Sequence, residues 1–230
     1  MPIPAPMPAP RPIRLFHITA LANLPAICNA GGLQAKNVGA AAGINYQNIA
    51  HAGAQGRRAQ RTVPNPPGGV VHDFVPFYFA PRSPMLYAIN GGKVAGCDLR
   101  QQDIIYFETS VERVSVESPE FVFYDRNASL VFSAAYTDIL MLDEVVAWDL
   151  LTESPQLDGF CQYWQNKTGD SRYADRMEKR QAEFLVKSSV PLTSITRIGV
   201  IDTARQAQVQ TILQQSNVYL TVDVMPAWYF

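Results

Sequence analysis

The sequence predicts an α+β protein in which several short strands form the core and a few helices flank them. Two observations support this fold class. Apolar runs of β character recur along the whole chain, and the helical patterns between them do not follow the regular strand–helix alternation of a doubly wound sheet. The sequence also lacks a Gly-x-Gly-x-x-Gly motif and a P-loop, so a nucleotide would have to be held in another way.

Length and composition indicate one globular domain. The 230 residues are 47% hydrophobic and 17% charged, which is enough for a large core and excludes a disordered chain. We find no internal repeat and no linker, so residues 13–230 are predicted to form a single domain. The net charge of −1 excludes a uniformly basic protein that coats nucleic acid, but it is compatible with a local basic groove.

Residues 1–12 are predicted to form a disordered, proline-rich tail. They alternate Pro with small residues and lack the apolar segment of a signal peptide. No apolar run is long enough to span a membrane, and three widely spaced cysteines fit a reducing cytosol better than a disulfide framework. The cysteines therefore favour a cytoplasmic protein. The histidines and cysteines also lack the spacing of a zinc site, so we expect no metal.

The strands are predicted from runs of apolar, β-branched and aromatic residues. The opening strand alternates loosely between apolar and polar residues, and the later ones are more continuously apolar. The predicted strands are residues 13–18, 70–79, 104–109, 121–124, 182–186, 195–201 and 218–224.

The helices are predicted mainly from capping residues. Thr19 is placed to cap a helix over residues 21–29, which a pair of glycines ends. Ser83 followed by Pro84 is typical of an N-cap and first helical position, here for residues 85–89. The other predicted helices are residues 129–136, 143–151 and 203–214.

Residues 39–69 are predicted to form a long loop, with a short helix within residues 48–61. Loops of this length in compact domains are commonly functional or disordered. This one carries Arg57, Arg58 and Arg61, whose planar guanidinium groups suit a pyrophosphate or a nucleic-acid backbone. A solvated helix face is the alternative explanation for three arginines in five residues.

Glu183 stands at the start of an apolar strand, directly after a basic and aromatic stretch at residues 172–180. A lone acid in this position suits an enzyme that handles an anionic substrate, although a solvated strand end is the simpler interpretation. His17 lies near the end of the opening strand, where helix N–H groups could bind a phosphate, although a lone histidine in a strand is more often a core residue whose hydrogen bonds are satisfied. Residues 75–87 are rich in aromatic rings that could enclose a planar heterocycle, or they form an ordinary core strand and turn.

Taken together, these segments resemble the DarT family, the DNA ADP-ribosyltransferase toxins of the DarT–DarG toxin–antitoxin pairs. The motifs occur in the family's order between residues 13 and 202, and the most specific is VPFYF with RSPM followed far downstream by QAEFLV. The matching segments are residues 16–19, 23–24, 32–33, the arginine cluster, 72–79, 82–87 and 180–186.

The resemblance implies a split, mostly antiparallel β core with flanking helices, and a cleft that binds NAD. It also implies transfer of ADP-ribose from NAD, as co-substrate, onto a base of single-stranded DNA with release of nicotinamide. The motifs favour thymidine over guanosine as the target. A macrodomain antitoxin that removes the modification is the partner that the family predicts.

The resemblance also assigns roles to residues. Glu183 is expected to bind the ribose 2′-OH and to stabilise the developing positive charge, and Arg61 is the first choice for a catalytic arginine, with Arg57 and Arg58 left open. Tyr78 has no settled stacking role, because the middle motif departs from the Arg-Ser-Glu and His-Tyr-Glu signatures. The predicted NAD contacts are His17, Ile18, Thr19, Asn23, Leu33, Arg57, Arg58, Tyr78, Met85 and Leu86. Residues 151–180 are expected to recognise DNA, and the predicted DNA contacts are Asn127, Tyr163, Trp164, Tyr173, Arg176 and Arg180.

Two other interpretations remain open on the sequence alone. The same NAD cleft would permit ADP-ribose transfer onto RNA or protein. A non-catalytic module that binds NAD or nucleic acid would leave Glu183 as a structural strand end.

Overall fold

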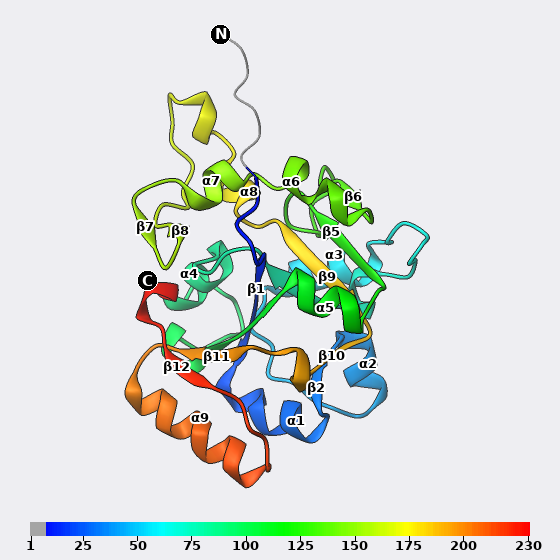
Figure 1. Cartoon of the computed structure of the whole chain (residues 1–230), viewed down its shortest axis with the longest axis vertical. Helices are drawn as coiled ribbons and strands as arrows, with labels where there is room; N and C mark the ends of the chain where they lie inside the picture. Colours follow the sequence, from blue (N-terminus) through cyan, green and yellow to red (C-terminus); the bar gives the residue numbers. More distant parts are fainter. Residues whose placement is uncertain (1–7) are drawn as a thin grey trace.

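The computed structural model describes residues 8–230, and within them the core is an eight-stranded sheet in the order β12-β11-β4-β1-β3-β9-β5-β6 (Figure 1). Neighbouring strands are antiparallel except β11 and β12, which are parallel. This confirms the predicted α+β class. The strands are β1 (Arg14–Ala20), β3 (Phe74–Tyr78), β4 (Ile104–Ser110), β5 (Phe121–Tyr124), β6 (Ala135–Tyr136), β9 (Glu183–Lys187), β11 (Arg197–Val200) and β12 (Val222–Val224).

The sheet is split between β1 and β3. These two strands are joined at one pair, Phe16 with Tyr78, whereas β1 pairs with β4 along its whole length and β3 pairs with β9 along all of its own. The result is one half made of β12, β11, β4 and β1, and another made of β3, β9, β5 and β6. Beyond the joining pair β1 and β3 form no further pairs, and His17, Ile18 and Pro76 of these strands line a cavity.

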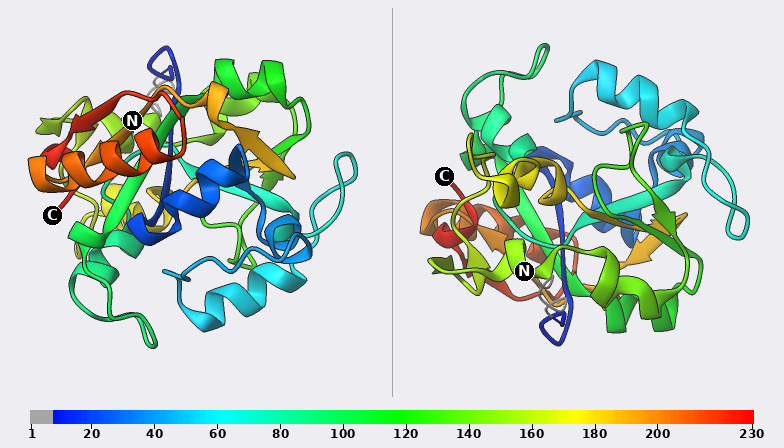
Figure 2. Two further views of the ribbon diagram at one scale, coloured as in Figure 1. Left: turned by 90° about the horizontal axis from the view of Figure 1, so that it is seen from below. Right: turned by 90° about the horizontal axis from the view of Figure 1, so that it is seen from above.

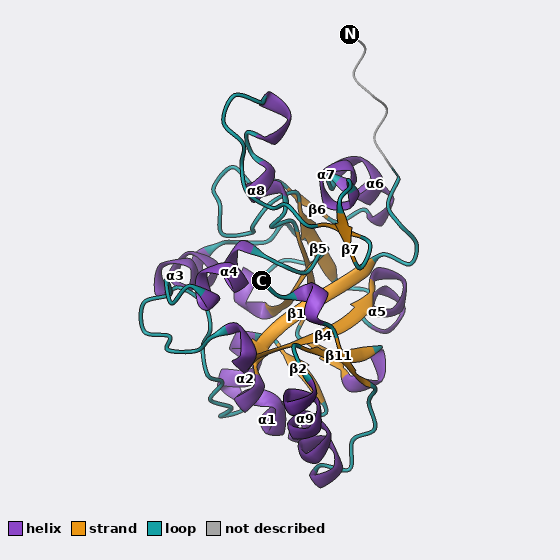
Figure 3. Ribbon diagram, turned by 90° about the vertical axis from the view of Figure 1, so that its left-hand side faces the viewer, coloured by secondary structure: helices purple, strands orange, loops and turns teal. Residues whose placement is uncertain are grey.

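Short helices surround the sheet on several sides. In Figure 3 the strands pass through the centre of the molecule, with α3 and α4 on one side and α5 and α6 on the other. Both views of Figure 2 place α3 and α9 at opposite sides of the protein. The helices are α1 (Leu24–Asn29), α2 (Lys36–Ala41), α3 (Ala52–Gln60), α4 (Pro84–Asn90), α5 (Val111–Glu117), α6 (Leu142–Val145), α7 (Trp148–Thr152), α8 (Arg176–Lys179) and α9 (Thr203–Gln215).

Two small antiparallel pairs complete the described structure: β2 (Gly32–Gln34) with β10 (Ser189–Pro191), and β7 (Gln156–Leu157) with β8 (Phe160–Cys161). Gly32 is required in the first pair because a Cβ there would lie 2.3 Å from the Val190 carbonyl oxygen. Along residues 8–230, none of the helices combines the length and the apolar character that crossing a bilayer demands.

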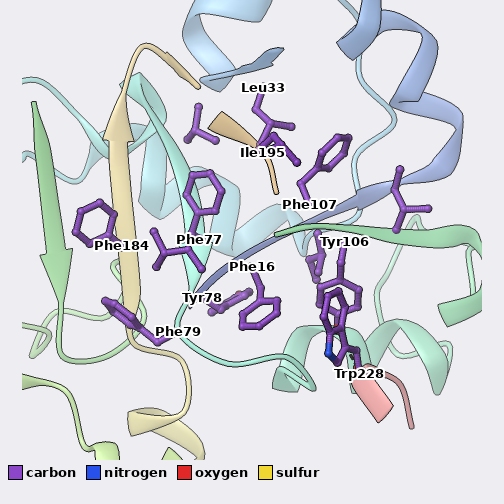
Figure 4. Packing of buried hydrophobic residues seen from close by; sticks show 14 of the residues in the cluster. Phe16, Leu33, Phe77, Tyr78, Phe79, Tyr106, Phe107, Phe184, Ile195 and Trp228 are labelled. Atoms are coloured by element: carbon purple, nitrogen blue, oxygen red, sulfur yellow. Dashed lines mark hydrogen bonds between the residues drawn. The ribbon is translucent and has the colours of Figure 1, made fainter. Parts of the chain in front are cut away.

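The core explains why β9 reads as a continuous apolar run. Phe184 packs with Phe79 and Phe123 on one face of the strand, and Leu185 is buried in a second, smaller cluster on the other face. Figure 4 shows the rings of Phe77, Phe79 and Phe184 on one side of the split and those of Phe16, Tyr106 and Trp228 on the other. A strand covered on both faces lacks the alternation of apolar and polar residues that a half-exposed strand shows. The acidic Glu183 at the start of β9 is therefore exceptional.

Several predicted elements need correction. Thr19 remains in β1 and accepts a hydrogen bond from Asn23 Nδ2 (2.9 Å), so it does not cap a helix; a 3-10 turn at Leu21–Asn23 precedes α1 instead. Residues 129–136 are a turn and β6, not a helix, because carboxylates bind the backbone N–H groups of this region. Residues 143–151 hold two short helices separated by the extended Val146, and α5 was not predicted.

The predicted tail falls partly outside the described residues. Residues 1–7 lie outside them. Within residues 8–12, Ala9 is buried and its N–H donates to Asp143 Oδ1 (3.0 Å), and Arg11 pairs with Asp143 (3.2 Å) and Glu112 (3.5 Å). These contacts hold residues 9–11 against the domain, so the prediction of disorder through residue 12 is not supported there.

Candidate active site

A row of paired residues crosses the sheet where its two halves join. Tyr78 of β3 pairs with Phe16 on one side and with Glu183 of β9 on the other. Glu183 in turn pairs with Tyr124 of β5. Directly opposed residues on antiparallel strands point to the same face, so Tyr78, Glu183 and Tyr124 share one face of the sheet. Burial and the nearby Glu183 both raise the pKa of the Tyr78 hydroxyl, which therefore stays protonated.

Glu183 is a buried carboxylate with a full set of hydrogen-bond donors. Its side chain is 2% exposed. Arg58 Nη1 donates to Oε1 (2.9 Å) and Oε2 (2.8 Å), the Ala128 N–H donates to Oε2 (3.1 Å), and Asn127 Nδ2 lies 3.4 Å from Oε1. A buried charge is tolerated only when it is paired and hydrogen-bonded, so these donors fix the position of the carboxylate. The alternative of a solvated strand end is therefore wrong.

Helix α3 places the three candidate arginines in different environments. Arg58 faces inward, is 9% exposed and pairs with Glu183. Arg57, one position earlier, is exposed. Arg61 ends the helix and donates from Nη2 to the Ser133 carbonyl (2.9 Å). The structure therefore places Arg58, and not the first choice Arg61, beside Glu183; the catalytic role of either arginine stays a prediction.

A cavity of about 240 Å³ opens beside Glu183 at the split in the sheet. His17 lies at the split, where its Nδ1 donates to the Pro76 carbonyl (2.8 Å) and so connects β1 with β3. Of the predicted NAD contacts, Arg57 and Leu86 do not line the cavity, and Leu86 is fully buried in the core. The predicted residues that do line it are His17, Ile18, Thr19, Asn23, Leu33, Arg58, Tyr78, Met85, Asn127 and Glu183.

The segment between α2 and α3 covers one side of the cavity. Asn23 anchors it: the Asn23 amide accepts from the Gln47 N–H (2.7 Å) and donates to the Gln47 carbonyl (3.0 Å). The same amide holds the Thr19 hydroxyl (2.9 Å), which ties the covering segment to the end of β1. Lys36 Nζ donates to Gln55 Oε1 (2.7 Å) and joins α2 to α3 at the cavity wall. The long loop of the sequence is therefore an ordered wall of the cavity.

The sequence did not identify every polar group in this wall. Lys36, Tyr46 and His72 all line the cavity, and both Tyr46 Oη and His72 Nε2 are buried without a hydrogen-bond partner within residues 8–230. Burial, and secondarily the charge of Arg58, lower the pKa of Lys36. Unpaired buried polar atoms are rare and call for an explanation such as a bound ligand. Lys36, Tyr46 and His72 are far from Glu183 in the sequence, so no local sequence pattern groups them with it.

The two histidines of the cavity are neutral at physiological pH. Burial lowers the pKa of His17 to about 4, and burial together with the charges of Lys36 and Arg58 lowers the pKa of His72 to about 4. Since the Pro76 carbonyl can only accept, His17 carries its proton on Nδ1 and presents Nε2 as an acceptor. The positive charge at this end of the cavity therefore comes from Lys36 and Arg58.

These lowered pKa values predict a loss of stability in mild acid. Unfolded histidines take up protons near pH 6.5, whereas His17 and His72 in the fold do so only near pH 4. Their contribution to the free energy of unfolding is complete above pH 6.5 and is lost as the pH falls toward 4. Thermal melts at intervals from pH 7.5 to 4.5 should show a falling Tm, with a smaller fall for a His17→Gln/His72→Gln variant. An equal fall in that variant would contradict this assignment.

Most of the predicted DNA contacts in residues 151–180 are engaged inside the protein. Arg180 is buried and donates to the carbonyls of Pro81 (3.1 Å), Cys161 (3.2 Å) and Leu151 (3.5 Å). It joins three separate segments and does not offer a free phosphate contact. Arg180 was predicted to contact DNA, and the structure buries its guanidinium among these carbonyls, with Nε left without a hydrogen-bond partner in residues 8–230.

Arg176 and the aromatic residues of this segment are also largely enclosed. Arg176 is buried, pairs with Glu153 (3.1 Å) and lies 4.0 Å from the centre of the Tyr173 ring. Trp164 is buried against Tyr87. Tyr163 is half-exposed and is free to meet a ligand at the surface. Asn127, from outside the segment, lies at the cavity beside Glu183.

Comparison with known proteins agrees with this fold. The family model described as "ssDNA thymidine ADP-ribosyltransferase, DarT" matches residues 16–230. A DNA ADP-ribosyl transferase of Thermus aquaticus is 36% identical, over 96% of this chain and 90% of the relative. The solved structure of Thermus sp. 2.9 DarT in complex with ADP-ribosylated ssDNA aligns with a TM-score of 0.83 at 33% identity, over 98% of this chain and 100% of that chain.

A second solved structure, Thermus sp. 2.9 DarT in complex with NAD+, gives a TM-score of 0.79 at 32% identity, over 96% of this chain and 100% of that chain. The family model spans most of the sequence, and the resemblance drawn from the motifs is confirmed. The chain belongs to the DarT family of single-stranded DNA thymidine ADP-ribosyltransferases.

Proposed function

We propose that the cavity at the split in the sheet binds NAD+, and that Glu183 with Arg58 there transfers ADP-ribose to thymidine in single-stranded DNA. The observation that supports this most strongly is the buried Arg58–Glu183 pair at the cavity wall. A carboxylate fixed by several donors is pre-organised, and pre-organised charge is the largest source of transition-state stabilisation in many enzymes.

The chemistry assigns Glu183 its part. The bond between nicotinamide and ribose C1′ breaks as positive charge develops on the ribose, and a fixed carboxylate can accept a hydrogen bond from the 2′-OH and stabilise that charge. The only ring N–H of thymine in DNA is at N3, so attack from N3 forms the new bond to C1′ and releases a proton. In this proposal Glu183 accepts that proton and passes it to solvent.

The rest of the cavity suits a dinucleotide. Lys36 and Arg58 supply positive charge for a pyrophosphate. Neutral His17, the buried Tyr78 hydroxyl and the Asn23 amide supply directional hydrogen bonds around apolar walls such as Ile18 and Leu33, a combination typical of ligand sites. The groups named here form the proposed NAD+ site, and no step in this scheme needs a metal.

The direct test of the target is mass spectrometry of oligonucleotides incubated with the protein and NAD+. We expect a mass increase of one ADP-ribose unit on single-stranded DNA that contains thymidine. Matched strands without thymidine, the same sequence as RNA, and the duplex should stay unmodified. Nicotinamide release with no modified nucleic acid would point to a protein target, and absence of NAD+ consumption would favour a non-catalytic binding module.

The family further predicts a macrodomain antitoxin that removes the modification, and a cytoplasmic site of action. Both stay predictions. Incubating a modified oligonucleotide with a macrodomain protein encoded next to this chain should restore the unmodified mass.

A further inference from the structure

The turn between β5 and β6 is built into the active site at its base. The Ala128 N–H donates to Glu183 Oε2 (3.1 Å), and Asn127 lies against the same carboxylate. Farther along, the Ser133 carbonyl accepts from Arg61 (2.9 Å) and the Ala134 N–H donates to Asp125 Oδ1 (2.9 Å). Both ends of the turn are therefore held in fixed positions, one by the proposed catalytic carboxylate and the other by α3 and Asp125.

The tip of this turn presents two apolar side chains to solvent. Val131 is 85% exposed and Phe132 is 65% exposed. The turn is closed by backbone hydrogen bonds from Leu130 to Asn127 (3.0 Å) and from Ser133 to Leu130 (3.1 Å), so its conformation is regular. Adjacent apolar residues on a fixed, solvent-facing turn are typical of a recognition surface.

The tip lies close enough to Glu183 to meet a nucleotide next to the target. Phe132 is four residues from Ala128, so their Cα atoms are at most roughly 14 Å apart. Arg126 strengthens the connection: its guanidinium lies 5.8 Å from the centre of the Phe132 ring and pairs with Asp175 (2.9 Å) at the start of α8. This ion pair joins the turn to residues 151–180, the segment that we expect to recognise DNA.

We propose that Val131 and Phe132 form a stacking surface for an unpaired base one or two nucleotides away from the target thymidine. The proposal rests on the proposed function, since it supposes single-stranded DNA at Glu183. An exposed aromatic ring beside a cation is the combination that proteins use to stack bases of single strands, and a single such contact changes affinity by about 5- to 100-fold. The surface thereby fixes the strand so that the target base reaches the carboxylate.

The experiment measures kcat/KM for modification of a single-stranded oligonucleotide by wild type, Phe132→Ala, Phe132→Trp and Tyr219→Ala. Tyr219 is a matched control because it is 94% exposed and precedes β12, at the opposite edge of the sheet from β6. We expect a loss of about 5- to 100-fold for Phe132→Ala, near wild-type rates for the other two variants, and an unchanged shift of Tm by NAD+ in all of them.

A second arm replaces each nucleotide around the target thymidine in turn by an abasic site. If Phe132 stacks on one base, removing that base lowers the wild-type rate but does not lower the Phe132→Ala rate further, so the two losses are non-additive at that position. Wild-type rates for Phe132→Ala, or losses that add at every position, would overturn the proposal. Weaker macrodomain binding with an unchanged DNA rate would also overturn it and would assign the surface to a protein partner. Failure of the proposed function is distinct, because wild type would then modify none of the oligonucleotides.

Discussion

Replacing Glu183 with Gln is expected to lower ADP-ribose transfer to single-stranded DNA by on the order of 10²–10³-fold. The amide keeps nearly the same volume and can still accept the Ala128 N–H, but it loses the negative charge that the proposed mechanism places beside the ribose. Both nicotinamide release and the mass of the oligonucleotide should report the loss. We expect this substitution to have the largest effect on catalysis, because hydrogen bonds hold the Glu183 carboxylate in a fixed position within a buried site.

Folding must be separated from chemistry in this variant. The charge of Arg58 loses its partner in Glu183→Gln, so some decrease in Tm is expected. Rates are therefore compared well below the melting temperature, with circular dichroism to confirm the native fold. A folded Glu183→Gln protein that retains a tenth or more of the wild-type rate would exclude Glu183 as the group that stabilises the transition state.

Arg58→Ala is expected to be both destabilising and inactivating. It leaves Glu183 buried without a cation, and breaking a buried ion pair from one side costs about 3–5 kcal/mol of unfolding free energy. Arg57→Ala on the same helix should stay within about 0.5 kcal/mol of wild type, because Arg57 is exposed. Urea unfolding of the two variants, together with the transfer rate, measures both effects.

Arg61→Ala distinguishes Arg61 from Arg58 as the arginine of the active site. It removes the hydrogen bond to Ser133, so we expect a smaller loss of stability than in Arg58→Ala. If Arg61→Ala were inactive and Arg58→Ala were as active as Arg57→Ala, the assignment of Arg58 as the arginine of the active site would be wrong.

The sequence identified the central strand and its acid because that pattern is local. An apolar run covered on both faces excludes charge, so a glutamate at its start stands out. The choice among the arginines was not available from sequence. Helix α3, with the sequence AGAQGRRAQ, has no stripe of large apolar residues that would set its rotation, and only the partner 125 positions away in the chain shows which arginine faces inward.

The basic and aromatic stretch before Glu183 is more enclosed than its composition suggests. Such residues are exposed on average, but two of the arginines here have partners that are remote in sequence, Glu153 for Arg176 and the Pro81 carbonyl for Arg180. The cavity groups Lys36 and His72 were missed in the same way, since they meet only when α2, α3 and β3 pack together. Local pattern therefore located the catalytic strand, and long-range pairing decided which neighbouring residues face the ligand.

NAD+ is proposed to occupy the cavity beside Arg58 and Glu183, so a bulky side chain that fills this cavity should prevent NAD+ from binding. Ala54 of α3 lines the cavity, whereas Ala59 of the same helix is exposed and lies outside the lining, so Ala54→Trp and Ala59→Trp form a matched pair. The measurement is the shift of Tm by NAD+ at a concentration about 100 times the wild-type Kd, where binding adds about 2.7 kcal/mol and raises the Tm by roughly 5–10 °C. We predict this shift for wild type and Ala59→Trp and none for a folded Ala54→Trp. An undiminished shift in Ala54→Trp would contradict the claim and place NAD+ elsewhere.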